Sequence, residues 1–221
     1  MRQGTLERFA PLSGVLFLLL IIVGPFILTG ETPDVDDSTR DVVDFWSDND
    51  TQVIIGSILG TLAAVSLVWF GGVLRTTLRA AEGGTGRLSA VAFGGTLIAA
   101  VGILLFASLE FAAADSVNDV PPQVTQTLSV MDSEMFFIAV GGVIVMLLST
   151  AVLTLTTGAL PRWLGWAAIV ILIVSFTPAG FIGFLAFLLW VAVVGIVIYR
   201  AQEAPPGTAT PPPAAAPPGP S

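Results

Sequence analysis

One carboxylate, Glu110, falls inside a long apolar run of the sequence. A carboxylate within a membrane helix is a functional hypothesis by default, and its usual role is proton coupling. Glu110 comes about 20 residues after Ala90, or about 30 Å along a helix, which brings it near one interface of a bilayer. We therefore expect water to solvate Glu110. We interpret it first as an interfacial, structural residue and second as a proton or ligand site.

A second group of carboxylates recurs at helical spacing before the second apolar run: Asp37, Asp41, Asp44 and Asp48. Hard oxygen ligands suit calcium, but the segment lacks the known calcium-loop pattern. Counted from Asp34, position six is Thr39 instead of glycine, and position twelve is Phe45 instead of glutamate. A solvated anionic helix face is the simpler interpretation, so we predict no metal site and no cofactor.

Histidine, cysteine and lysine are absent from the sequence. Their absence excludes haem with its usual axial ligands, an ordinary zinc site, a histidine-based triad and a lysine Schiff base. No nucleophile elbow is present either. We therefore expect a protein with no catalytic residues that is not an enzyme.

The elements that must position these residues are membrane helices. Hydrophobic residues make up 54% of the chain and charged residues 11%, against about 25% charged residues in soluble domains. Six apolar runs approach the roughly 20 residues that cross a bilayer. They cover residues 12–28, 53–74, 88–111, 135–155, 163–176 and 181–199. The predicted fold is an all-α integral membrane bundle of six transmembrane helices within residues 1–200.

The fifth and sixth runs are separated only by residues 177–180, so one long bent helix is the alternative. Pro178 and Gly180 favour a hairpin. The first run has a different alternative, a cleaved signal peptide. Leu28 is unsuitable at the third position before a cut after Gly30, which favours a retained helix.

Charge asymmetry predicts the orientation. Seven of the eight arginines lie on one side of the six runs. They are Arg2, Arg8, Arg75, Arg79, Arg87, Arg162 and Arg200. Because arginine is enriched in cytoplasmic loops, both termini are expected in the cytoplasm of a bacterium, with the protein in its plasma membrane. Residues 201–221, rich in Pro and Ala, form a tail that we expect to be disordered.

Both outer loops contain segments that predict short amphipathic helices. Ser38 followed by Asp41 is a capping-box arrangement that opens a helix through about Ser47. We expect that helix to lie at the membrane surface with Trp46 at headgroup level. In the second loop, a helix is expected to start at Pro121 and Pro122 and to end at Asp132, before the fourth span.

Small residues on the second and third spans predict close helix crossings. They are Gly56 and Gly60 on the second span, and Gly95, Ala99 and Gly102 on the third. Packing within one chain is favoured over packing between copies, because a six-helix chain has its own helices to pack.

Four segments carry a resemblance to a known family: PLSGVLFLLLIIVG, TPDVDDS, EGGTGRLSAVAFGG and GALPRWLGWAAIV. The chain resembles uncharacterised actinobacterial multipass membrane proteins grouped as the domain of unknown function 4386. That resemblance implies six helices and a plasma-membrane location, and it supplies no functional residue.

A non-enzymatic scaffold, accessory or envelope protein is the leading interpretation, since no catalytic cluster is present. We expect membrane lipids as partners and no nucleic acid. A membrane-protein partner and a homo-oligomer both stay open as alternatives. The alternative is a small transporter or permeation protein for a small solute or lipid, using Glu110 and a polar cavity that reaches the membrane midplane. A lipid-modifying enzyme ranks third.

Overall fold

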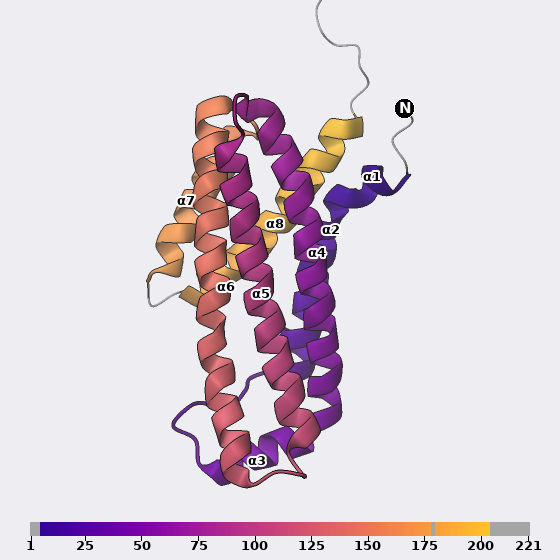
Figure 1. Ribbon diagram of the computed structural model, residues 1–221, viewed down its shortest axis with the longest axis vertical. Coiled ribbons are helices and arrows are strands. Elements are labelled where there is room, and N and C mark those ends of the chain that lie inside the picture. The colour runs from indigo at the N-terminus through magenta and orange to yellow at the C-terminus, as the bar shows by residue number, and fades with distance from the viewer. Residues whose placement is uncertain (1–4, 178–179, 204–221) are drawn as a thin grey trace, which may run out of the picture.

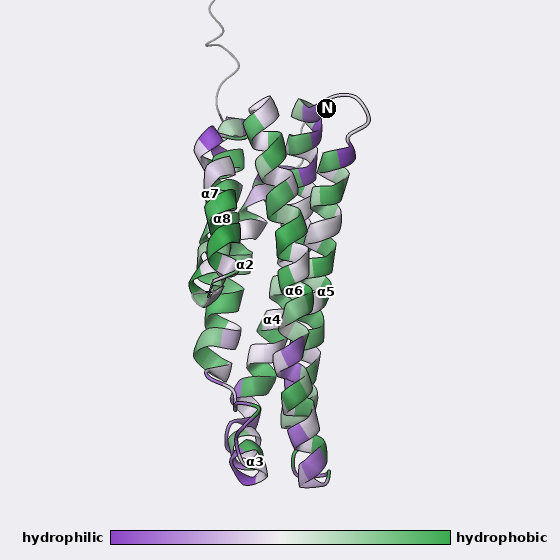
Figure 2. Ribbon diagram, turned by 90° about the vertical axis from the view of Figure 1, so that its left-hand side faces the viewer, coloured by the Kyte–Doolittle hydropathy of each residue, from purple (hydrophilic) through white to green (hydrophobic). Residues whose placement is uncertain are grey.

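The computed structural model describes residues 5–177 and 180–203, and this part of the chain is helical throughout, without strands (Figure 1). The expected disordered tail lies outside the described residues except for residues 201–203, which are helical instead. Five helices are long and apolar enough to cross a membrane. They are Glu7–Thr29, Asp50–Glu82, Arg87–Ser116, Pro122–Thr157 and Gly180–Glu203. A sixth helix, α7 (Arg162–Ser175), is apolar but has only 14 residues. The chain is therefore an all-helical membrane protein, and its green apolar residues cover most of the helix length in Figure 2.

The first membrane-length helix is built from successive pieces. They are α1 (Thr5–Phe9), the 3-10 turn η1 (Ala10–Leu12), α2 (Ser13–Ile21) and the π-helical segment η2 (Ile22–Thr29). Pro25 lies inside η2 and brings no backbone N–H, so the regular α-helical ladder cannot continue through it. The wider turns end with the Gly30 N–H donating to the Pro25 carbonyl at 3.0 Å.

Three long antiparallel helices form the main body: α4 (Asp50–Glu82), α5 (Arg87–Ser116) and α6 (Pro122–Thr157). The closest crossing joins α5 and α6. A Cβ added to Gly95 would lie 2.5 Å from the Met146 nitrogen, and one added to Gly142 would lie 2.6 Å from the Gly95 carbonyl oxygen. Gly102 faces the backbone of Ala139 in the same way. Backbones can approach this closely only because these positions carry no side chain.

The second glycine-rich crossing packs η2 against α4. A Cβ on Gly24 would lie 2.8 Å from the Gly56 carbonyl oxygen, and one on Gly56 would collide with the Thr29 hydroxyl. A Cβ added to Gly60 would lie 3.4 Å from the Ala107 Cβ of α5. The small residues of α4 therefore meet two different helices of the same chain.

The last two helices, α7 and α8 (Gly180–Glu203), return toward the beginning of the chain. The indole N–H of Trp190 donates to the Leu164 carbonyl at 3.0 Å and ties α8 to α7. At the far end of α8, Glu203 forms an ion pair with Arg8. The N-terminal helix and the end of α8 therefore lie at the same end of the molecule, opposite α3 (Figure 1).

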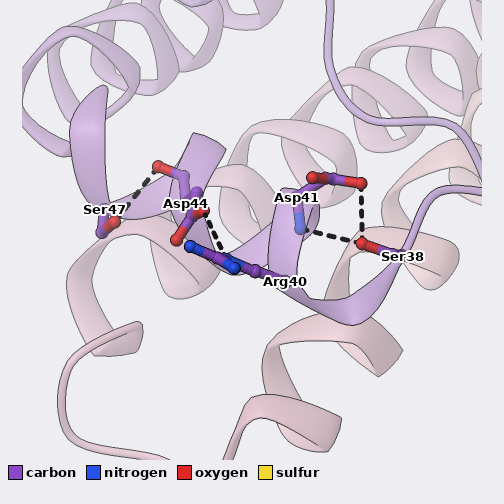
Figure 3. Close-up of polar contacts among 5 residues, drawn as sticks. All are labelled: Ser38, Arg40, Asp41, Asp44 and Ser47. Carbon is purple, nitrogen blue, oxygen red and sulfur yellow. Dashed lines mark hydrogen bonds and ion pairs between the residues drawn. The ribbon is translucent and has the colours of Figure 1, made fainter.

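The loop between the first helix and α4 contains α3 (Thr39–Asp48). Figure 3 shows its start, where the Asp41 N–H donates to the Ser38 hydroxyl at 3.3 Å and that hydroxyl donates to the Asp41 carboxylate at 2.6 Å. Arg40 and Asp44 pair on the exposed face. On the opposite face Trp46 is 0% exposed, packed with Val42 and the outer ends of α4 and α5. The prediction of Trp46 at the lipid headgroups is wrong, because α3 lies on the helix bundle and buries its apolar face there.

The second outer loop also differs from expectation. No separate short helix ends at Asp132, because α6 runs without interruption from Pro122 to Thr157. With α5 extending to Ser116, only residues 117–121 connect the two helices. The expected second-loop helix is therefore the first turns of α6, which project beyond the level where the first membrane-length helix ends.

Candidate functional site: a buried carboxyl pair beside an apolar cavity

Glu110 is almost completely buried in the structure, with 1% of its surface exposed. It lies 23 residues after Arg87, the start of α5, or about 35 Å along the helix. Its depth near one interface of a bilayer stays a prediction, but the expectation that water solvates Glu110 is wrong, because the side chain is buried. Its Oε2 atom is buried without a hydrogen-bond partner among the described residues. The cause is the extension of α4, α5 and α6 past this level, with α3 packed on their ends.

Asp132 is the second buried carboxyl, also 1% exposed, and its Oδ1 has no described hydrogen-bond partner. The helix register brings it to Glu110. Gly102 of α5 packs on Ala139 of α6, and eight residues further toward the outer end Glu110 comes level with residue 131, next to Asp132. The two carboxyls are close enough to repel each other when both are ionised. Within the described chain neither one belongs to an ion pair.

Three buried hydroxyl side chains lie on α4 and α6, the helices that pack against α5 at this site. Ser57 of α4 interacts with the Glu110 carboxyl, and its hydroxyl donates to the Val53 carbonyl at 2.8 Å. Thr125 and Ser129 precede Asp132 on the same buried face of α6. We call Ser57, Glu110, Thr125, Ser129 and Asp132 the outer polar core. The Thr125 hydroxyl also lacks a described partner. Each buried polar group without a partner costs about 1–3 kcal/mol, so such a concentration is unusual in a purely structural interior.

Sequence reasoning missed Asp132 as a site residue because it was assigned to a solvated loop. A signal was present. Thr125, Ser129 and Asp132 follow the i, i+4, i+7 spacing of one helix face, and the same face continues into the apolar span. A polar stripe in line with a buried apolar stripe predicts buried polar groups.

An apolar cavity of about 180 Å³ adjoins Glu110. Its walls come from the first membrane-length helix and from α4, α5, α6 and α8, and Glu110 is its one ionisable lining residue. The other lining residues are Ile21, Pro25, Phe26, Gly30, Thr32, Gly60, Gly102, Ile103, Phe106, Ala107, Ala139, Phe181 and Phe184. Two glycines expected to serve packing, Gly60 and Gly102, therefore also shape the cavity.

A second, polar hollow lies beside this cavity. It is lined by Glu31, Thr32, Pro33, Asp34, Asp37, Asp41 and Phe45. Thr32 lines both spaces, so the acidic hollow adjoins the apolar cavity. Among the residues the structure describes, no group of three or more His, Cys, Asp or Glu side chains is arranged to hold a metal ion.

The hydroxyls at the other end of α6 lie apart from this site. Ser149 donates to the Val145 carbonyl at 2.8 Å and Thr157 to the Leu153 carbonyl at 2.7 Å, so these two hydroxyls are satisfied on their own helix. The Thr150 and Thr154 hydroxyls are buried without a hydrogen-bond partner among the described residues. No hydroxyl from this end of α6 lines the cavity.

A family model described as a domain of unknown function, DUF4386, matches residues 12–181. The chain belongs to this family. The matched segment covers more than half of the chain and includes every residue of the outer polar core. In this DUF4386 protein the carboxyl pair and most of the cavity wall are thus part of the family domain, and Phe184 lies just past the match. Searches of curated proteins and of solved structures found no match.

Proposed function

We propose that this protein is a multipass plasma-membrane protein that spans the bacterial membrane six times, with both termini in the cytoplasm. Two observations support this topology. Arginines concentrate at one end of the bundle. Arg8 and Glu203 pair at that same end, and when both ends of the described chain lie on one side the number of crossings is even. In this arrangement α7 is the short fifth span.

The topology can be tested with single thiols, because the natural chain has no cysteine. Asp36→Cys should react with a membrane-impermeant maleimide in intact cells. Thr85→Cys and Gln202→Cys should react only after the cells are permeabilised. Labelling of Gln202→Cys in intact cells, with Thr85→Cys protected, would contradict the even number of crossings.

For function, we propose a non-enzymatic membrane protein that binds a small amphipathic molecule in the cavity beside Glu110. The observation that carries this proposal is the combination of an apolar cavity with a single buried carboxyl at its end. Ligand sites typically pair apolar walls with a few polar groups that orient the ligand. A cavity of about 150 Å³ lined by apolar side chains stays dry and accepts benzene, so 180 Å³ accommodates one ring or a short alkyl chain.

The cavity favours binding or transport over a scaffold role. A scaffold role does not require a buried carboxyl next to an apolar cavity. The cavity is lined mostly by carbon, however, and a water-filled permeation path would need more polar walls. An amphipathic molecule is consequently a better candidate than a small hydrophilic solute. Surrounding lipid and exogenous hydrophobic compounds are both sources of such a molecule.

Native mass spectrometry of the protein released from nanodiscs tests this proposal. We expect a retained small molecule of fixed mass. Ala107→Met extends a side chain into the cavity and should remove that molecule, whereas Ala90→Met, on the exposed face of α5, should retain it. Retention that is equal in both variants would contradict binding in this cavity, and a protein that never retains a ligand would favour the scaffold role.

A further inference from the structure

Resting on the proposed function, we infer that the molecule bound in the cavity is an organic cation: an apolar amine in its ammonium form, or a quaternary ammonium. Its positive charge lies against Glu110 and its apolar part fills the cavity. It reaches the cavity from the acidic hollow.

The first support is the charge of the outer polar core. Two carboxyls, Glu110 and Asp132, lie close together and 1% exposed, with no ion pair to either among the described residues. A buried carboxylate is costly unless a cation pairs with it or a proton neutralises it. An ammonium group at the end of the cavity would provide that pairing directly for Glu110 and through space for Asp132. A neutral or anionic head group would not.

The second support is independent and comes from the acidic hollow. Four carboxylate residues line it: Glu31, Asp34, Asp37 and Asp41. Two of these are held in place, because the Asp37 carboxylate accepts from the Asp34 N–H at 2.8 Å and the Asp41 carboxylate accepts from the Ser38 hydroxyl at 2.6 Å. Concentrated negative charge at the mouth of a site raises the local concentration of cations and repels anions.

The hollow and the cavity meet at Thr32, which lines both. A cation attracted to the hollow therefore lies next to the cavity that Glu110 lines. The whole chain carries a net charge of −8, and the arginine-rich end lies away from this route. Charge and position thus select the same class of ligand.

An inorganic divalent cation fits the cavity less well. Calcium takes six to eight oxygen ligands, whereas the cavity wall supplies one carboxyl among mostly carbon atoms. The apolar wall does not stabilise a bound bare ion. It stabilises a bound ring or alkyl group by about 25 cal/mol for each Å² of apolar surface that leaves water. An organic cation uses both parts of the site.

The test compares matched probes on the full chain in nanodiscs of zwitterionic lipid. Benzylamine is charged at neutral pH, benzyl alcohol is a neutral probe of similar shape, and calcium chloride supplies the bare ion. Binding is measured by isothermal titration, with empty nanodiscs as the reference for partitioning. We expect benzylamine to bind about tenfold or more tightly than benzyl alcohol, and calcium to leave benzylamine binding unchanged.

Substitutions of the carboxyl residues test which side chain pairs with the positive charge of the ligand. Glu110→Gln should weaken benzylamine binding by about tenfold while changing benzyl alcohol binding by less than about threefold. Glu134→Gln is the matched control, because Glu134 is exposed on α6 close to Asp132 in sequence. Asp132→Asn serves as the second variant if Glu110→Gln does not fold, and it should weaken benzylamine binding several-fold without altering the cavity wall.

The access route has its own variant. Glu31→Gln with Asp34→Asn should weaken benzylamine binding at low salt, and the difference should vanish near 1 M salt, where the screening length is about 3 Å. Asp115→Asn with Asp119→Asn removes the same charge from the end of α5 and its connection to α6 and should have a smaller effect.

The possible outcomes separate the two proposals. Equal binding of benzylamine and benzyl alcohol, both lost in Ala107→Met, would overturn the cation inference and leave the proposed function intact. Calcium binding that requires Glu110, without benzylamine binding, would also overturn the inference. If no probe binds and native mass spectrometry finds no retained molecule, the proposed function itself would be overturned.

Discussion

Glu110 of α5 and Asp132 of α6 lie level with each other across the α5–α6 crossing, and each is 1% exposed. Two acidic side chains in the interior of the helix bundle must be neutralised by protons or by a cation, because uncompensated charge is costly in a low-dielectric interior. Stability measurements on substitutions at Glu110 therefore report the cost of this arrangement.

Glu110→Gln should preserve or increase stability, since an amide of nearly the same shape can hydrogen-bond with Ser57 and carries no charge. Glu110→Ala should reduce stability by about 1–3 kcal/mol, because Asp132 and Ser57 lose a polar neighbour and the cavity enlarges. Reversible denaturation in mixed micelles measures both. A larger loss for the glutamine variant than for the alanine variant would indicate that the negative charge itself stabilises the fold.

Adjacent glycines on α6 should respond in opposite ways to alanine. Gly142→Ala would bring a Cβ to 2.6 Å from the Gly95 carbonyl oxygen and should destabilise by about 1–3 kcal/mol. Gly141→Ala meets nothing within 4 Å and should be neutral or stabilising by up to about 1 kcal/mol through helix propensity. The same denaturation assay checks the pair, and equal effects would mean that α5 and α6 do not cross at Gly142.

Trp46 should behave as a tryptophan buried in protein. In a single-tryptophan variant with the other four replaced by Phe, its fluorescence should resist both acrylamide and brominated lipid, because Trp46 is 0% exposed. The companion variant that keeps only Trp69, which is 66% exposed on α4, should be quenched strongly by brominated lipid. Ready quenching of Trp46 by acrylamide would show that α3 leaves the bundle.

Ser38→Ala should loosen the start of α3, because the Asp41 N–H loses its side-chain acceptor. A lost N-cap costs about 0.5–2 kcal/mol, so hydrogen exchange in the first turn of α3 should accelerate by about 2- to 30-fold. Ser47→Ala is the control, since the Ser47 hydroxyl donates only to the Asp44 carbonyl near the other end of the helix. Exchange that is equally fast in both variants would indicate that the cap does not limit opening.

Local sequence properties predicted the elements well. Hydropathy depends on composition over about 20 residues, so the apolar runs coincide with the helices that the structure contains. Ser38 and Asp41 are three residues apart, and the helix start they predicted is where α3 begins. The glycines Gly56, Gly95 and Gly102 lie at close approaches to other helices, because small residues are what such approaches require.

The sequence by itself thus determined the class of protein and the position of its helices, since hydropathy and capping act between near neighbours along the chain. Only the tertiary structure decided the surroundings of Glu110. Its burial depends on how far α6 projects past it and on α3 covering the helix ends, and its pairing with Asp132 depends on the α5–α6 register. Burial and register arise from contacts between residues far apart in sequence, which no local pattern records.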